Sequence, residues 1–540
     1  MPSERKIINE MDHYILSEHI SIPVDSRITR RNPNTLVLGS TEDCLSHYIG
    51  PNILQASCSY VIHDLDGVIY KRYGRFMECK GYKVKCLDLV NPGTSSHYNP
   101  FKYIHSDKDI EYLVNTLISN TNPHDKKEMN PFLEKSETAF LIALIAYLYH
   151  YAEKSKQRFS NAVKLIHMEE ASEGELSAES PLEHIFAELE KTDPEAYALK
   201  QYKIFKTDAN RPLEEVMYSC AARLQAFDLP DISNLTDTDD IRLDNVGDEK
   251  TALFVIIPSN RRTLNFIAAA MYLQFFREMI RYCENSVKYS QLVMDGDGKP
   301  VRVFRAGTED EIPIKQKEAY AYLQMLKNGC VQYDEGSGLY EIISSDGEPV
   351  VRYGREYEAF TALKSINCGS VKNNGRYSLP VHVKTIFTDL SSECLIDKFD
   401  ECMGIGVRFN MSFSFAVKSP EMLRNIYRDS FWSVEKNWPD IACQCDSIVC
   451  LDDRCLNGTE NKEIKEWIEN IIRFRRNNSI FARLKKKIKY IFQKERPFTF
   501  IPDNECMVII RSSKVEKDKK YTEFEHPSYR YFLACKKKYI

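Results

Sequence analysis

The sequence predicts an α/β protein with a mostly parallel sheet, interrupted by an all-helical insertion and a small α+β insertion. The first observation is a set of short runs rich in Val and Ile that recur toward both ends of the chain. The second is that these runs are continuously apolar rather than alternating, which is typical of strands buried on both faces. The third is that helical patterns separate them. The predicted strands are 35–38, 59–64, 82–89, 251–258, 384–390, 409–417, 446–453 and 505–511.

Length and composition exclude several classes of protein. At 540 residues, with 43% hydrophobic and 28% charged residues, the chain has material for a large core spread over several domains, which excludes wholesale disorder. A net charge of −5 excludes a uniformly basic nucleic-acid coat. The N-terminus lacks an apolar signal segment, and the longest apolar run, 139–149, is well short of the ~20 residues that span a bilayer. We therefore expect a cytoplasmic protein in which 139–149 is a buried helix.

The order of the patterns divides the chain into parts. Helical periodicity continues through one long stretch between strands, and a second stretch contains two similar halves, each a strand-like piece followed by a helix, with a hairpin between them. The predicted parts are an N-terminal extension (1–33), three portions of the α/β domain (34–104, 246–288 and 379–540), the all-helical insertion (105–245) and the small α+β insertion (289–378).

The connection after the first predicted strand invites comparison with a phosphate-binding loop. Such a loop has the spacing GxxxxGK[ST], because backbone N–H groups wrap around phosphate, a Lys reaches the terminal phosphates and a hydroxyl reaches magnesium. Here Gly39 and Ser46 stand at the correct spacing, but Cys44 replaces the second Gly and Leu45 replaces the Lys. Taken alone, the stretch indicates an ordinary strand-to-helix turn.

A longer pattern surrounds this connection and is similar to a known family. The stretches that carry the similarity are RITRRNPNTLVLGS (27–40), GPNILQASCSYVIHDLDGVIYK (50–71), GYKVKCLDLVNPGTSSHYNPF (81–101), QYKIFK (201–206), GDEKTALFVIIPSN (247–260), SLPVHVKTIFTDL (378–390) and DNECMVIIRSSKVEKDKKYTEFEHPSYRYF (503–532). In these stretches the chain resembles the TraG/TraD coupling proteins, the hexameric ATPases of conjugation and type IV secretion. The resemblance implies a P-loop NTPase-like (RecA-like) sheet. Family members carry N-terminal membrane helices, and the resemblance begins almost where those helices would end, so we expect the anchor to be missing.

The first nucleotide motif implied by the resemblance is degraded. The phosphate-loop Lys falls on Leu45 and the loop glycine on Cys44, while Glu42 and Asp43 add two carboxylates where phosphates would lie. A carboxylate about 5 Å from one phosphate charge costs on the order of 3 kcal/mol at an effective dielectric constant near 20. Mg-ATP, the cofactor of the relatives, is therefore expected to bind poorly.

The second motif, an acidic pair at the end of an apolar strand, is also altered. In the family the Asp holds the magnesium shell and the Glu polarises the attacking water. These positions fall on Thr388, which cannot supply a metal carboxylate, and on Asp389, which is one methylene shorter than Glu. The polar sensor after the next strand falls on Lys418, and the arginines that would reach a neighbouring subunit's nucleotide fall on Ile405 and Val407.

These departures predict a phosphate-loop fold without catalytic residues, metal site or bound cofactor, in short a pseudo-ATPase. Gly39, Ser46 and Asp389 would be vestigial nucleotide-binding positions. The ordinary alternatives are a helix-start residue for Ser46 and a solvated strand-end carboxylate for Asp389. An active site could survive only if another cation replaced the absent lysine, and Lys418 or Arg408 are the candidates.

The strongest local charge lies in 473–496, which holds ten Lys or Arg residues against one Glu. Its apolar residues recur at helical spacing, so a helix there would carry an apolar stripe flanked by cations. Such a helix suits nucleic-acid phosphates or an anionic membrane surface, where it would replace the missing anchor. The alternative is a helix docked on its own domain with a solvated basic face. The candidate contact residues are Arg473, Arg475, Arg476, Arg483, Lys485, Lys486, Lys487 and Lys489.

Two further groups carry no predicted chemistry. Four cysteines cluster between 443 and 455, but without the paired CxxC spacing of structural zinc sites, so alternation along a buried strand explains them better. His63, beside Asp64 at a strand end, has no nucleophile next to it and is expected to be a core residue.

Three functions remain, in decreasing order of expectation. The first is a non-catalytic coupling-protein homologue that binds substrate or partners or assists assembly. The second is an active DNA-translocating ATPase with a rearranged site. The third is a nucleic-acid or membrane-surface adaptor that uses 473–496. The resemblance implies relaxosome or type IV secretion components as partners, engaged in relatives by the all-helical region, and a homo- or hetero-hexamer. DNA and the cytoplasmic face of the inner membrane are further expected contacts.

Overall fold

The structure, a computed structural model, divides the chain into two compact units. The first comprises Met1–Glu278 and Pro380–Ile540, and the second comprises Met279–Leu379. The structure describes residues 13–24, 32–122, 131–172, 180–207, 213–259, 264–289, 291–294, 330–334, 339–343, 349–353, 370–373, 379–388, 394–396, 399–418, 444–452, 503–510 and 514–537.

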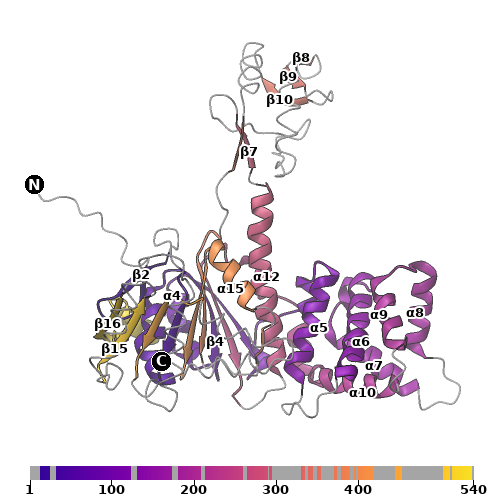
Figure 1. Ribbon diagram of the computed structural model, residues 1–540, viewed down its shortest axis with the longest axis horizontal. Helices are drawn as coiled ribbons and strands as arrows, with labels where there is room; N and C mark the ends of the chain where they lie inside the picture. The colour runs from indigo at the N-terminus through magenta and orange to yellow at the C-terminus, as the bar shows by residue number, and fades with distance from the viewer. Residues whose placement is uncertain are drawn as a thin grey trace, which may run out of the picture. The chain divides into compact units, whose positions relative to one another are not determined.

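A nine-stranded sheet forms the centre of the first unit, in the order β16-β15-β14-β3-β13-β12-β4-β6-β5 (Figure 1). Neighbours from β14 to β5 run parallel, whereas β15 and β16 join antiparallel at one edge. The predicted α/β class with a mostly parallel sheet is confirmed. The strands are β3 (Thr35–Leu38), β4 (Ser59–Leu65), β5 (Lys83–Asp88), β6 (Thr251–Ile257), β12 (Val383–Thr388), β13 (Met411–Val417), β14 (Ser447–Cys450), β15 (Glu505–Ile510) and β16 (Lys514–Lys519).

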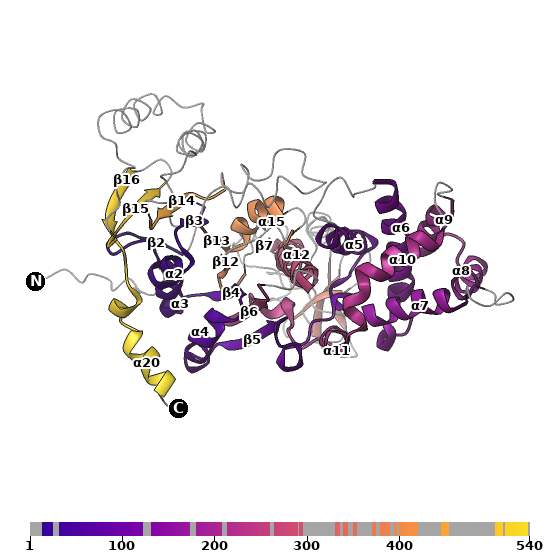
Figure 2. The same cartoon turned by 90° about the horizontal axis from the view of Figure 1, so that it is seen from below.

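Helices cover both faces of this sheet, as Figure 2 shows. On one face, alternate strand residues such as Val37, Ile62 and Ile386 share one buried cluster with residues of the covering helices. These helices are α2 (Thr41–Cys44), the π-helix η1 (Leu45–Ile49), α3 (Gly50–Gln55), α4 (Val68–Cys79) and α20 (Tyr529–Lys537). The other face packs against α12 (Asn265–Tyr289) and α15 (Phe399–Gly406) through aromatic rings: Phe387 lies 5.2 Å from Tyr272 and 5.3 Å from Phe399 between ring centres.

Residues between β5 and β6 form a helical segment. Arg277 of α12 binds Asp109 of α5 at 3.0 Å, which ties this segment to the sheet, and Arg223 of α10 binds the buried Glu137 of α6 at 2.8 Å. Residues 139–146 of α6 are buried, as predicted. The helices are α5 (Asp107–Thr121), α6 (Pro131–His150), α7 (Phe159–Ser172), α8 (Pro181–Thr192), α9 (Tyr197–Thr207), α10 (Leu213–Leu224) and α11 (Pro230–Asp237), with short 3₁₀ turns η2 (Pro92–Thr94), η3 (Pro100–Tyr103), η5 (Lys154–Lys156), η6 (Gln225–Asp228) and η7 (Leu243–Asn245).

The second unit contributes two small antiparallel sheets. β7 (Gln291–Met294) pairs with β11 (Ser370–Asn373), and β9 (Leu339–Ile343) lies between β8 (Cys330–Asp334) and β10 (Pro349–Tyr353). The helices predicted for the small insertion lie outside the described residues, and the predicted domain boundaries stay predictions.

Smaller elements complete the first unit. β1 (His13–Ile15) and β2 (Ser21–Pro23) form a hairpin, η9 (Val407–Phe409) precedes β13, and η11 (Glu523–Glu525) precedes α20. Within the described ranges, no helix combines the length and the apolar character needed to cross a bilayer.

Candidate functional site

The carboxyl ends of the parallel strands bring the predicted nucleotide positions to one edge of the sheet. Leu38 of β3 pairs with Val417 of β13, and Thr388 of β12 pairs with Ala416 in the same register. Gly39, Thr388 and Lys418 therefore follow or end neighbouring strands, at the edge where α/β sheets bind ligands. These sequence-distant residues therefore lie along one edge of the sheet.

The connection from β3 to α2 has no open loop. Of the six positions Gly39 to Cys44 that a phosphate loop would occupy, the last four form α2. Ser40 is the N-cap, and its Oγ accepts a hydrogen bond from the Asp43 N–H at 3.1 Å. The N–H of Cys44 donates to the Ser40 carbonyl, and that of Gly39 donates to the Val417 carbonyl. Three N–H groups of this connection, those of Gly39, Asp43 and Cys44, are thus used within the protein.

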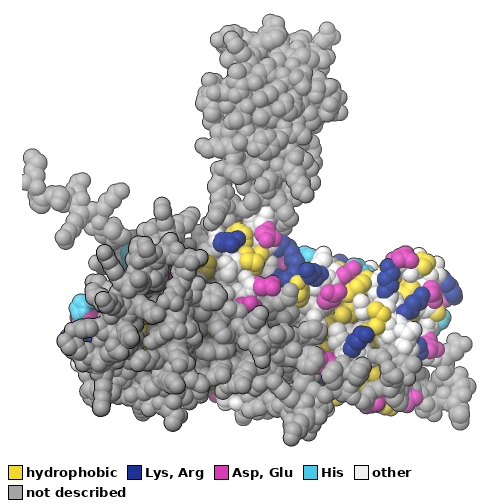
Figure 3. Space-filling view, in the orientation of Figure 1, with side chains coloured by type: hydrophobic (Ala, Val, Ile, Leu, Met, Phe, Trp, Pro, Cys, Tyr) yellow, Lys and Arg dark blue, Asp and Glu magenta, His cyan; other side chains and the backbone are white. Residues whose placement is uncertain are grey.

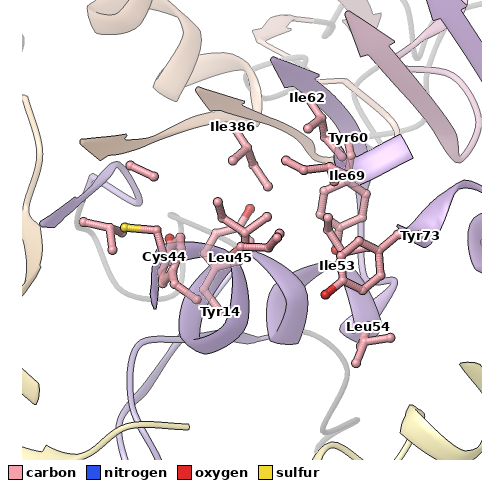
Figure 4. Close-up of a cluster of buried hydrophobic side chains, with 14 of the residues drawn as sticks. Tyr14, Cys44, Leu45, Ile53, Leu54, Tyr60, Ile62, Ile69, Tyr73 and Ile386 are labelled. Atoms are coloured by element: carbon pink, nitrogen blue, oxygen red, sulfur yellow. The ribbon is translucent and has the colours of Figure 1, made fainter. Parts of the chain in front are cut away.

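Cys44 and Leu45, the positions on which the loop Gly and Lys were predicted to fall, belong to the core. Cys44 is 2% exposed and Leu45 is 9% exposed, and both join the buried cluster on this face of the sheet. Figure 4 shows their side chains among those of the cluster, which includes Ile62 and Ile386 of the strands. A side chain at position 45 therefore packs against apolar neighbours, whereas a phosphate-loop lysine must reach the ligand.

Gly39 and Ser46, which were predicted to be vestigial nucleotide-binding positions, each lie among packed neighbours. A Cβ atom added to Gly39 would lie 3.1 Å from Cβ of Leu451, so close packing against the end of β14 favours glycine there. Ser46 is half-buried inside η1, after four residues of α2 and one of η1, and does not start a helix. Asp389 lies outside the described residues.

Asp43 is surrounded by partners that sequence reasoning missed. Its carboxylate accepts from Ser40 Oγ at 2.8 Å and lies 3.6 Å from Nζ of Lys520 and 3.8 Å from Nε2 of His47. Lys520 follows β16 and its side chain is only 6% exposed. Burial lowers the pKa of His47. The helix start, which attracts anions, is therefore already supplied with a carboxylate of the protein itself.

The strand end that would hold magnesium makes an internal contact instead. Thr388 is buried and its Oγ1 donates to the backbone carbonyl of His63 at 2.6 Å. Burial lowers the pKa of His63 to about 4, so its ring is neutral at pH 7. The ring lies 3.3 Å from the hydroxyl of Tyr272, in keeping with the core role predicted for His63.

The candidate replacement cations lie at opposite ends of β13. Lys418 is exposed and follows the strand at the edge that carries Gly39. Arg408 precedes the strand at the other edge, and Ile405 and Val407 are near it in α15 and η9. Because β13 is about 20 Å long at 3.3 Å per residue, Arg408 cannot serve the Gly39 edge of its own chain.

A second buried cation, Lys384 of β12, also escaped sequence reasoning. Its Nζ lies 3.2 Å from the centre of the Tyr14 ring and donates to the Tyr48 hydroxyl at 3.3 Å. Burial lowers the pKa of Lys384 to about 7. The only signal was a Lys within an apolar run, and its contacts join η1 to the sheet.

The remaining candidates are either buried or outside the described ranges. The basic stretch 473–496, Cys443 and Cys455 lie outside them, and Cys445 and Cys450 are buried in or next to β14. Among the residues the structure describes, no group of His, Cys, Asp and Glu could hold a metal ion. Figure 3 shows basic and acidic side chains interspersed over the helical segment, where Lys203–Glu190 and Lys206–Glu183 form ion pairs.

The strand order and these strand-to-helix connections define an α/β protein of the P-loop NTPase type whose β3–α2 connection is closed. Residues 46–294 match the family model for conjugative DNA transfer by the type IV secretory system. This stretch, just under half of the chain, is similar to the conjugative coupling proteins of the TraG/TraD type.

Solved coupling proteins have a similar fold. The bacterial conjugative coupling protein TrwB, lacking its N-terminal 70 residues and in a complex with sulphate, is 11% identical, with a TM-score of 0.51 over 94% of this chain and 89% of that one. The plasmid coupling protein TrwB with the ATP analogue ADPNP is 10% identical, with a TM-score of 0.50 over 94% and 89% of the two chains. At these identities the likeness concerns the fold. No curated protein matches the sequence.

Proposed function

We propose that this chain is a coupling-protein homologue that acts in partner or substrate binding, or in assembly, without hydrolysing ATP. The observation that carries the proposal is the closed β3–α2 connection. The N–H groups of Gly39, Asp43 and Cys44 donate to Val417 and Ser40, and the position of the phosphate-loop lysine is a leucine packed in the core. The family match begins at residue 46, just after these positions.

Three more features support the same proposal. Asp43 places a carboxylate at the start of α2, where it would repel phosphate. Thr388, in place of the metal carboxylate, donates its proton to a backbone carbonyl, and a hydroxyl so engaged is a poor magnesium ligand. Opening the connection would require unwinding α2 and exposing Cys44 and Leu45, so nucleotide would have to supply that free energy as well.

The partners we propose are relaxosome or type IV secretion components, and the assembly is a homo-hexamer or a hetero-hexamer with catalytically active coupling proteins. In this proposal the helical segment α5 to α11 is the partner-binding part. DNA is a further proposed contact, and the protein would act in the cytoplasm or at the cytoplasmic face of the membrane.

Thermal unfolding with and without about 5 mM Mg-ATP tests the proposal, because a ligand that binds only the folded state stabilises it by about 2.7 kcal/mol at a hundredfold excess over its Kd. We expect no shift in Tm for this protein and a clear shift for TrwB, which has been solved with ADPNP and is the positive control. A nucleotide-dependent shift in this protein would overturn the proposal.

A second function, an active DNA-translocating ATPase with a rearranged site, is favoured by one observation. Lys520 brings an ammonium to within 3.6 Å of Asp43, and Lys418 lies at the same edge of the sheet. If Mg-ATP does raise the Tm, the variants Lys520→Met and Lys418→Met identify the cation, since the shift should disappear only in the variant that lacks it.

A third function, an adaptor that uses 473–496, rests on the charge of that stretch. Deleting these residues should then abolish binding to anionic liposomes or to DNA at low salt. Unchanged binding by the deletion variant would remove this function from consideration.

A further inference from the structure

The C-terminal segment of the chain crosses the helices that follow β3 and β4. Lys520 reaches Asp43, the His47 ring contacts the Tyr521 carbonyl at 3.1 Å, and the buried carboxylate of Glu523 binds Arg72 and Tyr73 of α4. α20 then packs beside α4, as Figure 2 shows. These contacts connect the end of the chain to the former phosphate-loop edge.

Aromatic side chains fix α20 on α4. The Phe532 ring lies 5.4 Å from that of Tyr73 and 6.0 Å from that of Phe76, and the Tyr531 hydroxyl donates to the carbonyl of Cys79 at 2.9 Å. Nζ of Lys80 lies 4.6 Å from the centre of the Tyr531 ring. The first turn of α20 is thereby held against the second half of α4.

Two cysteines lie at this contact. Cys79 is the last residue of α4, and its carbonyl accepts from the hydroxyl of Tyr531, one helical turn before the buried Cys535 of α20. Cys79 is also one of the neighbours that raise the pKa of Cys535. Burial is the main cause that raises the pKa of Cys535, and nearby Lys80 lowers it. Of the cysteines whose side chains the structure describes, only Cys79 and Cys86 are not buried, so Cys79 is a thiol that a solute can reach.

We propose that Cys79 and Cys535 are a site of reversible disulfide formation that locks α20 onto α4. The oxidant is a small-molecule disulfide such as oxidised glutathione. The Cys79 thiolate attacks one of its sulfurs, which forms a mixed disulfide and releases one glutathione thiolate. Cys535 loses its proton to water and attacks Sγ of Cys79, which releases the second glutathione. Two protein thiols are oxidised while one glutathione disulfide is reduced to two thiols.

The lock would act on the candidate site through the C-terminal segment. With α20 fixed, the strand and turn that carry Lys520, Glu523 and His526 stay against α2, α3 and α4. With the thiols reduced, only noncovalent contacts hold this segment. A cross-link between distant parts of a chain restricts the open states most, so the oxidised form should open less often.

Peptide mapping of the full-length protein tests the site. The protein is incubated with oxidised glutathione, its remaining thiols are alkylated, and it is digested with trypsin without reduction. We expect the peptides FMECK (76–80) and YFLACK (531–536) to be recovered as one linked species that dithiothreitol separates. Cleavage of native protein within α20 should slow by about tenfold on oxidation.

Matched variants make the result decisive. Cys79→Ser and Cys535→Ser should abolish the linked species, whereas Cys86→Ser, which removes the other half-buried thiol, should keep it. Recovery of Cys79 carrying only glutathione in the wild-type protein would overturn the proposal, because it would show that the thiols cannot meet. If the disulfide-linked peptides form but cleavage within α20 is no slower, the disulfide does not lock α20 onto α4.

Discussion

Two strand-to-helix connections on the same face of the sheet differ in how they bind the N–H groups at the start of the following helix. β3 leads to α2 through Gly39 and Ser40, and β4 leads to α4 through Asp66 and Gly67. The second connection needs left-handed backbone at both residues, with φ of 56° and 72°, whereas the first has no residue with positive φ. Each connection has a different acceptor for the N–H groups that start its helix.

The acceptors differ in depth and charge. Asp64, at the end of β4, is buried and accepts from the N–H groups of Ile69 at 2.9 Å and Tyr70 at 2.7 Å. Ser40 is half-buried, and its Oγ accepts from the N–H of Asp43. At both helix starts, side chains of the protein accept hydrogen bonds from backbone N–H groups. The β3 connection, however, depends on a weaker, neutral acceptor and on the burial of Leu45.

Returning the phosphate-loop lysine should have the largest effect on this comparison. In Leu45→Lys the ammonium would enter an apolar cluster without a partner carboxylate, so we expect the free energy of unfolding to fall by about 4 kcal/mol. Chemical denaturation measures the loss. Leu45→Met, which conserves volume, is the control and should cost less than about 1.5 kcal/mol. Equal stability of the two variants, together with stabilisation of Leu45→Lys by Mg-ATP, would show that the connection opens.

The next largest effect concerns pH and the β4 connection. Burial raises the pKa of Asp64 from 3.8 to about 6, so between these values the folded protein holds a proton that the unfolded chain releases. The stability that this proton contributes is complete below pH 4 and is lost as the pH rises through 6. Asp64→Asn cannot titrate. The stability of the wild type relative to Asp64→Asn should therefore fall by about 3 kcal/mol from about pH 3 to about pH 7. Chemical denaturation of both proteins measures this difference. If their free energies of unfolding change equally with pH across this range, the pKa of Asp64 is not raised.

Much of the fold could be predicted because buried parallel strands leave a continuous apolar signal. Every predicted strand coincides with an observed one to within a few residues. β16 was missed because its sequence, KVEKDK, is charged, as suits an edge strand. The order of the strands in the sheet could not be predicted, because a single sequence shows the apolar runs but not which strands pair with one another.

The candidate site was predictable only in what it lacks. The sequence predicts the loss of the lysine and of the metal carboxylate, because the resemblance places these positions on Leu45 and Thr388. The closed connection also had a signal, because Ser40 followed three residues later by Asp43 is typical of a helix start. The approach of Lys520 to Asp43 and the burial of Lys384 had none of comparable strength, since both depend on contacts between distant parts of the chain.

The smallest effect compares the two caps directly. Asp64→Ala leaves two buried N–H groups without an acceptor and should cost about 2 kcal/mol, whereas Ser40→Ala removes one half-buried acceptor and should cost about 1 kcal/mol. Both are measured by chemical denaturation at pH 7, with Ser40→Thr as a control that keeps the hydroxyl and should restore most of the loss. Equal costs for the two alanine variants would remove the distinction between the connections. A Ser40→Ala variant as stable as the wild type would mean that the hydroxyl does not hold α2, and the closed state would then depend on the packing of Cys44 and Leu45 alone.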